Sequence, residues 1–194
     1  MDGKIIKMFL DAYGVDLYST LGMEYQKYRK PYLQEALLEA DAKNTPTEKD
    51  LKDKEEIEAA LDADQLVRLM RRKMSVTNTA LLRERLLRVQ KVVNVPIMEK
   101  VYTSGQETFA LNALYFLLHA DVDYSVFLYK IYEEVRSEFM KSCLCLCMGI
   151  RGSKEMLPML MQEAKRMSVN FPQEGLYQGP VIAVMELGAR VFGT

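Results

Sequence analysis

Residues 148–160 read MGIRGSKEMLPML, and this stretch is the clearest copy of an internal repeat with a spacing of 30 residues. The apolar residues that follow its glycine recur at the same offsets in residues 126–128 and again in residues 96–98, although these earlier copies lack the glycines. A two-helix unit of about 30 residues cannot bury its own apolar face, so several units must stack to form a core. The repeat therefore predicts a short α-solenoid.

Apolar residues recur at three- and four-residue spacing along almost the whole chain, and no stretch alternates with a period of two. This pattern predicts an all-helical protein. Expected helix starts are marked by Pro31, by Thr47, by the pair Asp62 and Gln65, by Ser104 and by Asp123. One of the helices is expected to bury a stripe formed by Leu82, Leu86, Val89 and Val93. Residues 40–47 are small and polar and contain a proline, which indicates a loop. We therefore expect an N-terminal helical segment over residues 1–45, followed by helical repeats over residues 46–194 in one continuous domain.

The stretch 148–160 resembles the turn and second-helix start of a HEAT repeat, because Gly149, Gly152, Leu157 and Pro158 stand at the matching offsets. The resemblance covers roughly residues 62–194 and is degenerate outside this copy. It implies a right-handed superhelical stack whose concave groove grips a protein. The last expected helix, residues 178–192, has no second helix after it. It caps the stack, or its free flank meets a second copy in a homodimer or a further part of the chain.

Composition excludes several classes of protein. Lys and Arg number 26 against 27 Asp and Glu, so no net charge draws the chain to nucleic acid or to an anionic membrane. The longest uncharged run, Thr108 to Ala120, has 13 residues, whereas a bilayer span needs about 20. Asp2 and Lys7 interrupt the start where a secretory signal would be basic and then apolar. We expect a cytoplasmic protein with no membrane partner.

Residues that could carry chemistry are few. Cys143 and Cys147 share one face of a predicted helix while Cys145 points away from them, so the three cannot converge on one metal ion. Small apolar side chains fit these positions, which predicts buried structural thiols. His119 is the single histidine and falls at a helix end, where we expect it to close the helix. Because no glycine-rich phosphate loop is present either, we expect no enzyme, no cofactor and no metal.

Charge is segregated along the middle of the chain. Residues 39–64 carry a net charge of −6, and residues 66–91 carry +7. Arg68, Arg71 and Arg72 are spaced to share one helical face, opposite the side that carries Leu66 and its apolar neighbours. The acidic helix could neutralise this basic segment, or the basic residues could contact a partner's acidic surface or nucleic-acid phosphates. The candidate binding residues are Arg68, Arg71, Arg72, Arg83, Arg85, Arg88 and Lys91.

These features lead to a hypothesis of a non-enzymatic scaffold or adaptor for protein–protein interaction, with the basic segment as its polar contact. The alternative is a nucleic-acid-binding HEAT-like protein that uses the basic helices over residues 66–91. HEAT-like alkylpurine glycosylases resemble the chain in having stacked helices and a basic groove. Their damage site uses aromatic residues that include tryptophan, and this chain has no Trp. The alternative is therefore nucleic-acid binding without catalysis.

Overall fold

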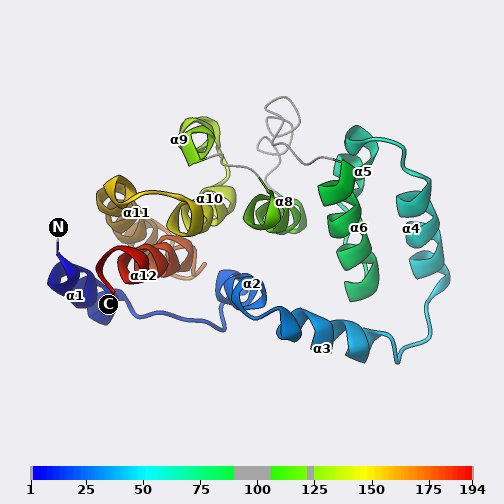
Figure 1. The fold of residues 1–194 in the computed structure, drawn as a ribbon, viewed down its shortest axis with the longest axis horizontal. Coiled ribbons are helices and arrows are strands. Elements are labelled where there is room, and N and C mark those ends of the chain that lie inside the picture. The colour runs from blue at the N-terminus through cyan, green and yellow to red at the C-terminus, as the bar shows by residue number, and fades with distance from the viewer. Residues whose placement is uncertain (1, 90–105, 122–124, 194) are drawn as a thin grey trace. The chain divides into compact units, whose positions relative to one another are not determined.

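The computed structural model describes residues 2–89, 106–121 and 125–193, and in these ranges its ribbon consists of helices joined by loops (Figure 1). They form eleven α-helices and one short 3-10 turn, with no strand in the described parts of the chain. The predicted all-α class is therefore confirmed. None of the helices within these ranges combines the length and apolar character that a bilayer span requires.

The chain divides into two compact units. One, here called the terminal unit, comprises residues 1–26 and 123–194; the other, the middle unit, comprises residues 27–122. The boundary expected after residue 45 lies inside the middle unit, and the division falls within α2 (Thr20–Arg29) instead. The first residues belong with the last because α1 (Gly3–Tyr13) packs against the C-terminal helix.

The terminal unit is organised around α12 (Gln178–Phe192), whose bounds match the predicted helix. This helix packs against α1, α10 (Glu138–Arg151) and α11 (Leu157–Asn170), and α9 (Ser125–Glu134) packs against α10. A Cβ added to Gly149 would stand 2.4 Å from the Cα of Ala183, so glycine is what lets α10 and α12 approach so closely. Residues 181–184 of α12 are completely buried. This helix is the centre of its unit rather than a covering at one end.

The predicted turn after residue 148 is confirmed. α10 ends at Arg151, and the backbone N–H of Gly152 donates a 2.7 Å hydrogen bond to the Met148 carbonyl. The 3-10 turn η1 (Lys154–Met156) follows, and α11 begins at Leu157 with Pro158 in its first turn. Arg190 of α12 donates to the carbonyl of Ile150 at 2.7 Å, which satisfies an acceptor that the end of α10 would leave unpaired.

The middle unit is organised around α6 (Val76–Val89). Among the described residues of the unit, this helix contacts α3 (Pro31–Asp41), α4 (Glu48–Ala59), α5 (Ala63–Leu69) and α8 (Glu107–His119). Leu66, Leu82 and Leu114 are completely or almost completely buried in this unit. α6 is therefore the packing partner that these four helices share.

The predicted helix starts are present in the middle unit. The hydroxyl oxygen of Thr47 accepts from the Asp50 backbone N–H, and the Asp50 carboxylate accepts from that of Thr47, which forms a complete capping box. Asp62 caps α5 through a 2.9 Å hydrogen bond from the Gln65 N–H. α3 begins at Pro31. Two expected caps, Ser104 and Asp123, lie outside the described residues.

The helix expected after Pro31 is present as α3, and none of its residues is buried. One expectation about a buried face is wrong. Val89, expected to be buried with Leu82 and Leu86, is 43% exposed because it stands at the last turn of α6, and Val93 lies outside the described residues. Apolar periodicity identifies α6 correctly but overstates how much of it is covered.

Candidate interaction site

The predicted arginine cluster does not lie on one helix. α5 ends at Leu69, where the Met70 N–H reaches the carbonyls of both Leu66 and Val67. Arg71 and Arg72 follow this end, so the prediction that they share a helical face with Arg68 is wrong. The apolar side of the prediction is confirmed, since Leu66, Leu69 and Met70 are buried.

Arg72 joins the basic segment to the acidic helix α4. Its Nη1 lies 2.7 Å from Glu56 Oε2 and 3.4 Å from Asp53 Oδ1. Asp53 is almost fully buried and also pairs with Lys49 at 3.0 Å. The predicted neutralisation between the two oppositely charged segments is therefore confirmed at Arg72.

Arg83 and Arg85 hold helices of the middle unit together. Arg83 is 8% exposed, its Nε donates to Asn112 Oδ1 at 2.8 Å, and its guanidinium lies over the Tyr115 ring. It is a core residue, and the prediction that it belongs to a binding surface is wrong. Arg85 is half-buried and donates at 2.7 Å to the carbonyl of Ala60, which follows the end of α4.

The remaining predicted residues differ in their surroundings. Arg88 is highly exposed, with its nearest carboxylate oxygen at 3.6 Å on Glu84. Arg71 lies with its guanidinium over the Phe109 ring. Arg68 is exposed and makes no hydrogen bond or ion pair with any residue that the structure describes. Lys91 lies outside the described residues.

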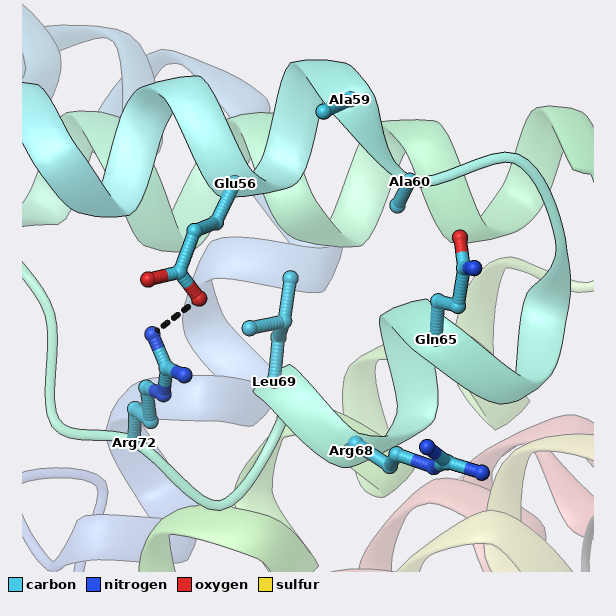
Figure 2. A pocket seen from close by; sticks show the side chains of 7 residues that line it. All are labelled: Glu56, Ala59, Ala60, Gln65, Arg68, Leu69 and Arg72. Atoms are coloured by element: carbon cyan, nitrogen blue, oxygen red, sulfur yellow. Dashed lines mark ion pairs between the residues drawn. The ribbon is translucent and has the colours of Figure 1, made fainter.

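A hollow of about 370 Å³ between α4 and α5 brings two of the predicted residues together. Figure 2 shows the Glu56–Arg72 ion pair at one end of this hollow, Leu69 pointing toward α4 in its middle, and Arg68 on the α5 side. We call this feature the α4–α5 hollow. Its lining residues are Glu56, Ala59, Ala60, Gln65, Arg68, Leu69 and Arg72.

Gln65 lines this site and was not predicted as part of it. The Oε1 atom of Gln65 accepts a 2.6 Å hydrogen bond from the Leu61 N–H, which fixes the amide at the edge of the hollow. Leu61, in the link between α4 and α5, is 85% exposed. The sequence indicated Gln65 only through its position three residues after the cap Asp62, and this capping contact is confirmed. A capping position does not indicate that the amide nitrogen lines a hollow.

The three thiols behave as the helical spacing predicts. Cys143, Cys145 and Cys147 are completely buried on α10. Burial raises the pKa of the Cys145 thiol well above its usual value, and burial also raises the pKa of Cys147. Within the described residues, no three His, Cys, Asp or Glu side chains are grouped as metal ligands. His119 ends α8 with its ring stacked on Tyr115 and its Nδ1 2.9 Å from the Tyr115 carbonyl.

A second polar cluster, which the sequence does not reveal, joins three helices of the terminal unit. Tyr132 of α9 donates its hydroxyl to Glu163 of α11, and Arg166 donates to Glu163 and to Glu138 of α10. Burial alone would raise the pKa of Glu163, but the hydrogen bonds from Arg166 and Tyr132 outweigh it and lower that pKa. Each of these groups has a partner, so the cluster holds the helices together.

We compared the chain with protein-family models, with curated proteins and with solved structures, and none of the three comparisons gave a match. The HEAT resemblance therefore depends on the residues of the chain itself. The site must be interpreted from its own geometry.

Proposed function

We propose that this chain is a non-enzymatic protein-binding module of the cytoplasm, built from helix pairs that stack as a HEAT-like, right-handed α-solenoid. The helix–turn–helix around Gly152 and the repeat spacing of 30 residues support the solenoid. Three buried thiols suit a reducing compartment. Function is inferred from the site, because a fold alone does not determine it.

The observation that carries the proposal is the α4–α5 hollow. It combines an exposed arginine that has no partner among the described residues with apolar side chains from both helices. Arginine is enriched at protein interfaces and at the residues that contribute most of their binding free energy. Arg68 is therefore the proposed principal contact, and the exposed Leu61 lies next to the lining residue Ala60.

The nucleic-acid alternative loses support from the same contacts. Arg72 and Arg83 make close contacts with Glu56 and Asn112, and Arg85 with the Ala60 carbonyl, so these cations serve the fold. A phosphate-binding surface needs several cations that face solvent. A homodimer through α12 is not part of the proposal, because the middle of that helix is buried within its own unit.

Affinity capture from an extract of the source organism tests the proposal, using the full chain with and without nuclease at two salt concentrations. We expect a partner protein to be recovered with nuclease as well as without it. Arg68→Glu should reduce this recovery at least about tenfold, because reversing the charge replaces an attraction with a repulsion. Arg88→Glu is the matched control, because Arg88 is exposed on a different helix. Equal recovery by both variants would contradict the site, and nucleic acid released by salt would favour the alternative.

A further inference from the structure

The charges around the α4–α5 hollow leave one cation without a counter-ion among the described residues. Glu56 is paired with Arg72 at 2.7 Å, the ion pair drawn as a dashed line in Figure 2. Asp53, beside this pair, is held by Lys49 at 3.0 Å as well as by Arg72. These two carboxylates are thus compensated within the fold. The net charge of the lining residues is positive and resides on Arg68.

The hydrogen-bonding groups next to that charge are donors. Arg68 and Gln65 both line the hollow from α5, and Figure 2 shows the Gln65 amide turned toward the end of α4 and the Arg68 side chain extending away from α4. The oxygen of the Gln65 amide already accepts from Leu61, while its Nε2 has no partner in the described ranges. A guanidinium and an amide nitrogen offer N–H groups only. Their complement is a group that accepts hydrogen bonds and carries negative charge, which is a carboxylate.

Apolar surface lies directly beside these donors. Leu69, Ala59 and Ala60 line the hollow, and Figure 2 shows Leu69 between the two helices. Leu61 is 85% exposed and follows Ala60 in the chain. A nucleic-acid backbone has no large aliphatic group to cover this surface, whereas a peptide can place a leucine-sized side chain next to an acidic one.

We propose that the α4–α5 hollow binds an acidic side chain of a partner protein, with a large apolar residue beside it in the same segment. The carboxylate contacts the Arg68 guanidinium, and the apolar residue covers Leu61 and the alanines at the end of α4. This assignment rests on the proposed protein-binding function and adds to it the chemistry of the partner.

Nuclear magnetic resonance with the full, isotope-labelled chain tests the assignment. One probe is a blocked pentapeptide with glutamate between two leucines, and its matched control carries glutamine in place of the glutamate. We expect the glutamate peptide to shift the signals of Gln65, Arg68 and Leu69, and to bind about fivefold more tightly than the glutamine peptide, the gain of one exposed charge contact. Arg68→Gln abolishes this difference, and Arg88→Gln preserves it.

Equal affinities for the two peptides, shifts confined to other residues, or no shifts at millimolar peptide would each overturn the assignment. An oligothymidine of about ten nucleotides that shifts the same signals and binds more tightly than the glutamate peptide would also overturn it, in favour of phosphate. The proposed function fails separately. Arg68→Glu could still abolish capture of the partner protein while the glutamate and glutamine peptides bind equally well. In that case the protein-binding function is supported, and only the acidic character of the partner is contradicted.

Discussion

The Nε of Arg83 donates a 2.8 Å hydrogen bond to Oδ1 of Asn112, and both side chains are buried in the middle unit. The Nδ2 of Asn112 in turn donates at 2.9 Å to the carbonyl of Met70, at the end of α5. One amide on α8 therefore satisfies a charged donor from α6 and a backbone acceptor beyond α5. If the Asn112 amide is removed, the Arg83 guanidinium and the Met70 carbonyl both lose this hydrogen bond.

Asn112→Leu is expected to lower the free energy of unfolding by about 2–4 kcal/mol, because it keeps the branched shape but removes a hydrogen-bond acceptor from a buried guanidinium and a donor from a buried carbonyl. Urea denaturation followed by circular dichroism measures the change. Asn170→Leu, at the exposed end of α11, is the matched control and should change stability by less than about 0.5 kcal/mol. Equal effects of the two substitutions would show that the Asn112 hydrogen bonds do not stabilise the unit.

Gly149→Ala is expected to destabilise the protein by about 1–3 kcal/mol, although alanine is normally the better residue inside a helix. The added Cβ would stand 2.4 Å from the Ala183 Cα, so α10 and α12 must move apart. Thermal unfolding measures the effect, and the account predicts a lower Tm for Gly149→Ala than for the parent. A variant as stable as the parent, or more stable, would mean that the two helices do not pack at this distance.

The three cysteines should resist thiol reagents in the folded protein, because all of them are completely buried. We expect modification at least about a hundredfold slower than in urea, since it requires opening of the structure. Reaction of any thiol at the unfolded rate in native buffer would contradict the burial of α10.

Burial also raises the pKa of Cys145 and Cys147, so the folded state favours their protonated thiols. Their contribution to stability is complete below the unfolded pKa, and it declines as the pH rises above about 8.5, where the thiols of the unfolded chain lose protons. Cys145→Ala combined with Cys147→Ala should therefore flatten the alkaline limb of the stability profile. Denaturation at several pH values checks this, and an unchanged alkaline limb would contradict it.

The lowered pKa of Glu163 predicts an acid-sensitive contact in the terminal unit. Its contribution to stability is present above the unfolded pKa and is lost as the pH falls through the folded one, roughly between pH 5 and pH 3. Glu163→Gln should weaken the acid dependence of stability in this window. Glu174→Gln, at an exposed carboxyl outside the cluster, is the control, and an equal flattening by both would contradict the assignment to Glu163.

Local signals in the sequence were enough to place most helix starts. Thr47, Asp62 and Pro31 act within the first turn of their own helices. The turn between α10 and α11 lies entirely within residues 148–160. The end of α5 was missed because Arg72, beyond that end, is paired with Glu56 on another helix. A pairing partner 16 residues away does not appear in helical periodicity.

The candidate site was predictable in part for the same reason. Charge segregation identified Arg68 and its neighbours, but it could not separate Arg83, which is buried against Asn112, from an exposed arginine. The hollow itself depends on how α4 and α5 pack, and neither helix contains that information alone. The place of Gln65 in the site depends on the hydrogen bond that its side-chain oxygen accepts from the Leu61 N–H, and the sequence does not show this bond.

Photo-cross-linking in cells tests the protein-binding claim most directly, with Leu61 replaced by the photoreactive amino acid benzoylphenylalanine. Leu61 is 85% exposed beside the α4–α5 hollow, and Val169, 69% exposed on α11, gives a control position. We predict a protein adduct from position 61 that is absent from position 169 and is lost when Arg68→Glu is added. The same adduct from both positions, an adduct with nucleic acid, or no adduct from position 61 would contradict protein binding at this site.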